Sequence, residues 1–349
     1  MSRRAVTLLT AAGFVVVLSI LAAVLPVPYV VLVPGPVTDT LGKVGTTPVV
    51  SVDGAQSYDD GGHLYLTTVG VIPGSCDKSP TLEQALRAWF NKHQAVQPKQ
   101  VICPPGQSSQ AVQQQNADEM TQSQQDAITA ALLYLHYKPT SQQIVVGDIS
   151  DGTPASKVLR TGDGIVAIDG TKVTGLDQLH SLISAKPAGN ELNITVDRGG
   201  KQTDLKARTI SSGGRTVLGF QPDLRATFSS PEVKIGIDPN SVGGPSAGLA
   251  FTLGIVDKLT PGSLTGGRTV AGTGTIDGFG NVGPIGGIQQ KIAAAHDAGA
   301  MVFLAPASEC TDARAAAPKS MTLVKVDTLT TAVHALESIS AGRNDFPRC

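Results

Sequence analysis

The sequence predicts an α+β protein with an N-terminal transmembrane helix, a small β-rich domain, and a larger domain in which helices pack on mixed sheets. An uncharged run from Ala5 to Leu25 predicts the membrane helix. Short β-branched segments separated by glycine turns predict the β-rich domain, and apolar helices close to strands near the C-terminus indicate the larger one. We expect divisions at 1–26, 27–140, 141–210 and 211–349.

The composition is that of a folded protein with no preference for nucleic acid. Of the 349 residues, 41% are hydrophobic and 16% are charged, and the formal net charge is −1. This length is enough for two domains. Because there is no basic excess, we expect no nucleic-acid partner.

The N-terminus predicts a membrane anchor. Arg3 and Arg4 precede the 21 uncharged residues from Ala5 to Leu25, and the next charge is Asp39. About 20 apolar residues cross a bilayer core. The arginines favour a cytoplasmic N-terminus, so the rest of the chain is expected outside, as a single-pass protein of the cell membrane. A cleaved secretory signal is the alternative, but the run is long for one and no clear Ala-x-Ala site follows.

The cysteines agree with an extracytoplasmic location. All four follow the apolar run, and an even number suits disulfides in an oxidising compartment. Three connectivities are open, and free thiols are the alternative. The simplest pairing by region joins Cys76 to Cys103 and Cys310 to Cys349.

A candidate nucleophile lies in the run Gly243-Gly244-Pro245-Ser246-Ala247-Gly248. Pro245 suits the first position of a helix that continues from Ala247 to Leu259, which places Ser246 in the first turn. Backbone N–H groups are unpaired there and the helix dipole is positive, so an oxyanion beside the serine could be stabilised. The alternative is that the Ser246 hydroxyl only caps the start of the helix.

A candidate base follows 45 residues later. In Pro284-Ile-Gly-Gly-Ile-Gln-Gln-Lys291, the paired glycines precede a predicted helix from Ile288 to Ala298, so Lys291 falls in its first or second turn. Burial and the positive helix end would both lower the lysine pKa, and a neutral lysine can accept the serine proton. A solvated surface lysine is the alternative.

These two segments resemble the boxes of the Lon family of serine proteases (peptidase S16 type), and the resemblance extends from about Pro231 to Val326. It implies a Ser-Lys dyad of Ser246 and Lys291 with Gly244, Pro245 and Ala247 as supporting residues. The stretch 272–276 resembles the family's Thr-Gly-Glu-Ile, which implies that Thr273 makes a hydrogen bond near the dyad.

Two positions depart from the family pattern. Many Lon proteases carry Asp where this chain has Gly243 and Glu where it has Thr275, so two carboxylates near the dyad are missing here. The form Gly-Gly-Pro-Ser-Ala-Gly-Leu resembles instead a bacterial subgroup that joins a Lon-type domain to a PDZ domain and a membrane anchor.

The middle of the chain resembles a bacterial PDZ domain. Short strands are predicted around Ile144 and Leu192, with Gly162-Asp163-Gly164-Ile165 leading into a central strand and a helix over 176–183. The resemblance implies that a peptide adds as a strand beside this helix. Residues 139–143 lack a glycine-containing carboxylate-binding loop, so a structural or gating role is the alternative to peptide capture.

The segment 27–140 is expected to complete the larger domain. A strand over 64–68, a short amphipathic helix over 82–93 with the only tryptophan, and a longer helix over 112–137 are too little for a core of their own. In the longer helix, Met120, Ile128, Leu132 and Leu135 are spaced for one buried face. The PDZ-like segment would then be an insertion in a discontinuous domain.

Missing motifs narrow the expected mechanism. The sequence contains no Gly-x4-Gly-Lys-Ser/Thr loop, no His-Glu-x-x-His and no Gly-Asn-Ser-Gly-Gly. We therefore expect an ATP-independent serine endopeptidase with no cofactor and no metal, acting on unfolded or flexible extracytoplasmic proteins. A non-catalytic PDZ scaffold that binds envelope proteins is the alternative. The resemblance also implies a homohexameric ring, for which no interface can be read from the sequence.

Overall fold

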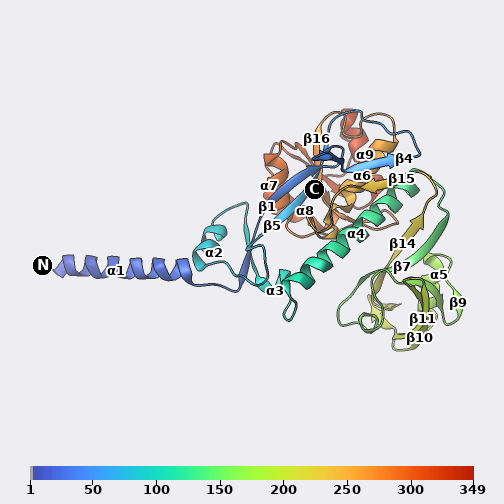
Figure 1. Ribbon diagram of the computed structural model, residues 1–349, viewed down its shortest axis with the longest axis horizontal. Coiled ribbons are helices and arrows are strands. Elements are labelled where there is room, and N and C mark those ends of the chain that lie inside the picture. The colour runs from blue at the N-terminus through green and yellow to red at the C-terminus, as the bar shows by residue number, and fades with distance from the viewer. Residues whose placement is uncertain (1–2) are drawn as a thin grey trace.

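The computed structural model describes residues 3–349, in which helix α1, Arg3–Val24, projects from the body of the protein (Figure 1). None of its residues is buried, and it is the one helix of the described chain that is long and apolar enough to cross a membrane. It begins two residues before the predicted span and ends one residue before its end. Met1 and Ser2 of the predicted cytoplasmic stub lie outside the described residues.

One six-stranded sheet combines strands from the two ends of the sequence. Its order is β20-β19-β16-β5-β1-β6, with bounds β1 Tyr29–Asp39, β5 His63–Ile72, β6 Ala95–Pro98, β16 Thr269–Gly272, β19 Val302–Pro306 and β20 Thr322–Val326. Strand β5 from the early segment pairs parallel with β16 from the last third of the chain, with Leu66 opposite Gly272. The early segment and the last third of the chain therefore share one core.

Helices cover both faces of this sheet. Alternate residues of β5 point to opposite faces, so Leu64 and Leu66 join one core while Tyr65 packs against the other. The first face is covered by α4 Ser109–Tyr134, α6 Gly248–Leu259 and α9 Leu329–Ser340, and the second by α7 Ile288–Asp297 and α8 Cys310–Ala316. The site described below lies where α4, α6 and α7 approach β16.

Helix α4 contacts α6 of the large domain and β14 of the small one. It starts after Ser108, whose hydroxyl accepts a hydrogen bond from the Ala111 N–H at 3.1 Å. Met120 and Leu132 are buried as the periodicity predicts, while Ile128 and Leu135 pack only partly against the same core. Figure 1 shows α4 running diagonally across the body, from the side near α1 to the neighbourhood of β15.

The small domain is a second sheet with its own core. The order β11-β10-β8-β7-β14 is formed by β7 Ser141–Ile149, β8 Gly164–Ile168, β10 Glu191–Arg198, β11 Lys201–Arg208 and β14 Phe220–Thr227, and β9 Thr171–Lys172 pairs with β8. Helix α5, Leu176–Ser184, packs on the sheet through Leu179 and Ile183. Strand β14 follows residue 210 and pairs antiparallel with β7, so it closes the small domain and returns the chain to the large one.

Short elements complete the structure. They are β2 Lys43–Val44, β3 Thr47–Pro48, β4 Val50–Asp53, β12 Ile210–Ser212, β13 Arg215–Val217, β15 Glu232–Ile235, β17 Thr275–Ile276, β18 Val282–Gly283, helix α2 Leu82–Trp89, helix α3 Lys99–Ile102, and the 3-10 turns Ala155–Lys157, Pro245–Ala247 and Ala307–Glu309. Helix α2 begins at the predicted residue, because Thr81 and Gln84 form a capping box, and ends four residues before the predicted end.

Both disulfides join cysteines that are close in sequence. Cys76 is bonded to Cys103 and Cys310 to Cys349, with S–S distances of 2.03 and 2.09 Å. These are the pairs predicted from the positions of the cysteines in the sequence. The first encloses α2, β6 and α3, and the second attaches the C-terminal residue to the start of α8.

Candidate active site

Ser246 lies at the entrance to an apolar helix. Pro245–Ala247 forms a 3-10 turn that runs directly into α6. The turn is preceded by Gly244 at φ 85°, a left-handed conformation that favours glycine. Ser246 is half-buried, whereas Ala247 and the following turn of α6 are buried. The serine hydroxyl is therefore the accessible end of a rigid element.

Backbone contacts fix this turn from two sides. The Ser246 carbonyl accepts hydrogen bonds from the Gly274 N–H at 3.0 Å and from the Thr273 hydroxyl at 3.1 Å. On the other side, the Ser123 hydroxyl donates to the Pro245 carbonyl at 2.9 Å, and the Gly244 N–H donates to the Asn116 carbonyl at 2.9 Å.

The two α4 contacts are absent from the sequence prediction. Asn116 and Ser123 are seven residues apart and so lie on one side of α4. That spacing is the one signal the sequence offers, and nothing in it names the turn at Pro245 as the partner. Only the fold brings these segments, more than a hundred residues apart, together.

Lys291 reaches the serine from the opposite helix. Helix α7 starts after Gly287, which has φ 68°, and Lys291 is its fourth residue. The lysine is 3% exposed. Its Nζ donates hydrogen bonds to the Ser246 Oγ at 2.8 Å and to the Thr273 Oγ1 at 3.0 Å. The structure thus brings together the three side chains that the sequence analysis singled out.

Burial lowers the pKa of Lys291 to about 7. The carboxylate of Glu309 acts in the opposite direction, because a nearby negative charge favours the ammonium form. Glu309, which lies 18 residues after the lysine and just before Cys310, is not among the site residues predicted from the sequence. Near neutral pH, a substantial fraction of Lys291 is therefore an uncharged amine that can accept a proton.

The packing of α4 explains one of the two departures from the Lon pattern. A Cβ at Gly243 would lie 2.7 Å from the Cβ of Asn116, so an aspartate does not fit there unless α4 moves. Thr275 is half-buried and stands opposite Gly283 in the β17–β18 hairpin. Within residues 3–349, no three His, Cys, Asp or Glu side chains gather in a way that could hold a metal ion.

The hairpin loop after Thr273 also contacts the small domain. The Gly278 N–H donates to the Asp223 Oδ1 of β14 at 2.6 Å, and Phe279 packs against the core of the small domain. A Cβ at Gly278 would lie only 1.8 Å from the Leu224 carbonyl oxygen, so the loop approaches β14 closely. One short segment, 273–281, therefore touches Ser246 at one end and the small domain at the other.

A buried pair of carboxyl groups lies at this junction. Asp126 of α4 and Asp223 share a hydrogen bond, and burial together with the Asp223 charge raises the pKa of Asp126 to about 9. Burial also raises the pKa of Asp223, although the N–H groups of Gly278 and Leu224, which donate hydrogen bonds to it, favour its ionised form. Asp126 therefore carries the shared proton at neutral pH.

Two segments of the chain match known domain families. Residues 225–337 match the family model of the Lon protease (S16) C-terminal proteolytic domain, and residues 119–209 match that of the PDZ domain. The chain contains a Lon-type proteolytic domain and a PDZ domain. In the structure the Lon-type domain also includes β1, β5 and β6, which lie outside the matched residues.

Curated relatives carry similar segments. The chain is 30% identical over 156 residues to Lon protease 1 of Bacillus subtilis (42% of this chain, 19% of the relative) and 28% identical over 185 residues to the Lon protease of Roseiflexus castenholzii (51% and 23%). The PDZ domain of an SdrC-like protein from Listeria monocytogenes is 25% identical, with a TM-score of 0.23, over 24% of this chain and 92% of that one. The chain thus spans about a fifth of the length of these two Lon proteases.

Proposed function

We propose that the protein is a serine endopeptidase that uses a Ser246–Lys291 dyad and needs no ATP. The observation that carries the proposal is the 2.8 Å contact between the Lys291 Nζ and the Ser246 Oγ, in a place where burial lowers the pKa of the lysine to about 7. A lysine at its usual pKa near 10.4 would be protonated and unable to act as a base. Catalytic bases work best with a pKa near the working pH.

The proposed reaction passes through an acyl-enzyme. The neutral Lys291 amine takes the proton of the Ser246 hydroxyl as its oxygen attacks the scissile carbonyl carbon, and the oxyanion forms beside the backbone N–H groups of the first turn. The lysine ammonium then protonates the leaving amine. A water molecule, deprotonated by Lys291, hydrolyses the ester and restores Ser246. Thr273 accepts a hydrogen bond from Lys291 and holds it in line.

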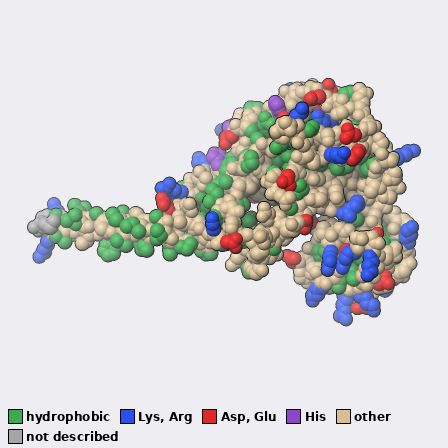
Figure 2. Space-filling model, viewed as in Figure 1, with side chains coloured by type: hydrophobic (Ala, Val, Ile, Leu, Met, Phe, Trp, Pro, Cys, Tyr) green, Lys and Arg blue, Asp and Glu red, His purple; other side chains and the backbone are tan. Residues whose placement is uncertain are grey.

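We further propose that the enzyme is anchored by α1 and works outside the cytoplasm. Helix α1 is long enough to span a bilayer and exposes its apolar side chains (Figure 2). Two disulfides in the body suit an oxidising compartment. In the absence of a nucleotide-binding loop in these 349 residues, the substrates would be protein segments that are already unfolded or flexible.

For the PDZ domain we propose a gating role in addition to substrate selection. The contact of Gly278 and Phe279 with the small domain supports this, because the same segment holds Ser246 through Thr273 and Gly274. If the domain only selected substrates, the variant Phe279→Ala would alter cleavage of proteins but not of a short peptide. We expect it to alter both.

The direct test is cleavage of unfolded casein by the full chain in detergent, beside Ser246→Ala and Lys291→Ala. Ser79→Ala, a serine far from the dyad in sequence, is a matched control that should keep full activity. Loss of cleavage in both dyad variants, with unchanged thermal unfolding, supports the proposal. Cleavage that persists in both variants would exclude Ser246 and Lys291 as the catalytic residues. If no form of the protein cleaves casein, a scaffold that only binds proteins is favoured.

A further inference from the structure

Four exposed apolar side chains lie on or directly after α2 and α3, the two short helices whose first residues hydrogen-bond to the chain just after α1. On α2, Leu86 and Trp89 are 47% and 73% exposed, Phe90 directly after α2 is 85% exposed, and Val101 of α3 is 61% exposed. Leu86, Trp89 and Phe90 are spaced i, i+3, i+4, and Phe90 keeps a helical backbone, so the three share one side of the helix, while Ala85 and Ala88 on another side are buried. We call these four exposed residues the base patch. All four lie in the segment that the Cys76–Cys103 disulfide encloses.

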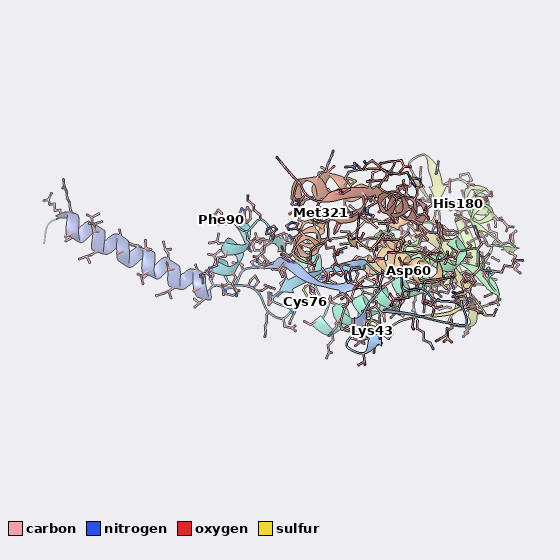
Figure 3. All side chains as sticks on the ribbon, turned by 90° about the horizontal axis from the view of Figure 1, so that it is seen from above. Lys43, Asp60, Cys76, Phe90, His180 and Met321 are labelled. Carbon is pink, nitrogen blue, oxygen red and sulfur yellow. A yellow bond between two sulfur atoms is a disulfide. The ribbon has the colours of Figure 1, made fainter. Side chains whose placement is uncertain are left out.

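Hydrogen bonds tie the patch to the end of the apolar helix. The Leu82 N–H at the start of α2 donates to the Leu25 carbonyl at 2.9 Å, and the Val27 N–H donates to the Pro80 carbonyl at 3.0 Å. The Lys99 N–H at the start of α3 donates to the Pro28 carbonyl at 3.1 Å. Figure 3 shows Phe90 at the end of the body next to α1.

These hydrogen bonds determine where the base patch lies relative to a bilayer around α1. Helix α2 has eight residues and is therefore about 12 Å long. It contacts α1, and the headgroup region adds about 5–8 Å on each side of the bilayer core. A bilayer around α1 would therefore meet the exposed side of α2 at the level of its headgroups. Tryptophan favours that level because its ring is largely apolar while its N–H can donate a hydrogen bond.

The charge of the segment fits a lipid surface that carries negative charge. Between Cys76 and Cys103 there are four basic residues, Lys78, Arg87, Lys92 and Lys99, and two acidic ones, Asp77 and Glu83, so the segment carries +2 while the whole chain carries −1. Basic residues near an anionic membrane are attracted to its negative surface charge. Apolar and basic side chains together are typical of a helix that lies in a membrane interface.

We propose that the base patch inserts into the interfacial layer of the bilayer that α1 crosses, with anionic phospholipid as its partner. This inference rests on the proposed membrane anchor and adds a second contact to it. It also concerns the catalytic helix, because the Gln290 side chain reaches the His93 carbonyl at 3.5 Å, in the turn that follows α2. Gln290 precedes Lys291, so the inserted patch would fix the dyad at a set distance from the membrane.

Trp89 is the only tryptophan of the chain and reports on this contact directly. The full chain is placed in vesicles of phosphatidylcholine and phosphatidylglycerol, with and without bromine on the acyl chains, and Trp89 fluorescence is measured. We expect brominated lipid to quench at least half of the emission and aqueous iodide to quench little of it. The double variant Leu86→Ser/Phe90→Ser should lose most of the lipid quenching and keep casein cleavage in detergent.

The matched control moves the tryptophan to the far end of the sheet. Met301 is 51% exposed and precedes Val302, which pairs with Val270, which in turn pairs with Leu64. Leu64 is eight residues from Ile72 at the α1 end of β5, or about 26 Å along the strand. In Trp89→Phe/Met301→Trp we expect quenching by iodide and none by brominated lipid.

Each result of these quenching experiments either supports or overturns the proposed insertion of the base patch. Quenching of Trp89 by brominated lipid supports it. Vesicle-bound protein whose Trp89 is quenched by iodide alone overturns it and leaves the anchor standing. Protection from both quenchers, with crosslinking between chains, overturns it in favour of a second copy on the patch. Chains that do not float with vesicles overturn both the anchor and the inference, while casein cleavage tests the dyad separately.

Discussion

The Lys291 Nζ lies 2.8 Å from the Ser246 Oγ, and the lysine that makes this contact is 3% exposed. Burial destabilises an ammonium ion that has no carboxylate bonded to it, and the hydrogen-bond partners of this one are two hydroxyl groups. The arrangement therefore favours the neutral amine, the form that a general base requires.

The first prediction concerns the pH dependence of cleavage. Because burial lowers the pKa of Lys291 to about 7, kcat/KM for casein should rise with pH through that value and level off above it. The rise reflects loss of the ammonium proton in the free enzyme. Initial rates between pH 6 and pH 9 measure it, and a flat profile over that range would exclude Lys291 as the base.

Glu309 allows this assignment to be tested from outside the dyad. Its carboxylate raises the pKa of Lys291 against the effect of burial, so Glu309→Gln should shift the rising limb to lower pH. Asp312→Asn, three residues further along and exposed, is the matched control and should leave the profile in place. If both variants keep the wild-type midpoint of the pH profile, the rise of kcat/KM with pH does not reflect the titration of Lys291.

Thr273 is expected to position the lysine. Its hydroxyl accepts from Lys291 and donates to the Ser246 carbonyl, so Thr273→Val removes both contacts at nearly constant volume. We expect kcat to fall about 10- to 100-fold, which corresponds to one hydrogen bond to a charged or ionising group. KM should change little, and Thr273→Ser should restore most of the rate. An equal loss in the serine variant would indicate a packing role instead.

The Asp126–Asp223 pair predicts a stability that falls with pH. The pKa of Asp126 is raised to about 9, whereas an unfolded aspartate titrates near 3.9, so in this window the native state holds a proton that the unfolded state has lost. The free energy of unfolding therefore decreases as pH rises between these values. Asp126→Asn has no proton to lose at this position, so its free energy of unfolding should not show this decrease. We expect the variant to become increasingly more stable than the wild type from pH 5 to pH 8.

Urea unfolding at several pH values measures that difference. Each unit by which the native pKa stays raised is worth about 1.4 kcal/mol, so a gain of at least this size is expected at pH 8. Asp118→Asn, on the exposed side of the same helix, is the control and should show no such trend. A difference that does not change with pH would mean that Asp126 is ionised in the folded protein.

Local patterns were sufficient for most of the elements. The apolar run predicted α1 to within two residues, and the predicted start of α2 at residue 82 was confirmed. The buried positions Met120 and Leu132 followed from helical spacing. The predicted end of α2 was wrong by four residues, because the chain leaves the helix after Trp89 and then forms β6, which pairs with β1. No local signal in residues 90–93 announces that pairing.

The sequence by itself determined the residues of the candidate site, because glycine, proline, serine and lysine at these spacings satisfy the local demands of two helix starts. The tertiary structure decided what surrounds them: the burial of Lys291, the opposing charge of Glu309, the support of the Pro245 turn by Asn116 and Ser123, and the contact of Gly278 with Asp223. These partners come from segments distant in the chain. Burial and close contact depend on how such segments pack, and no local pattern encodes them.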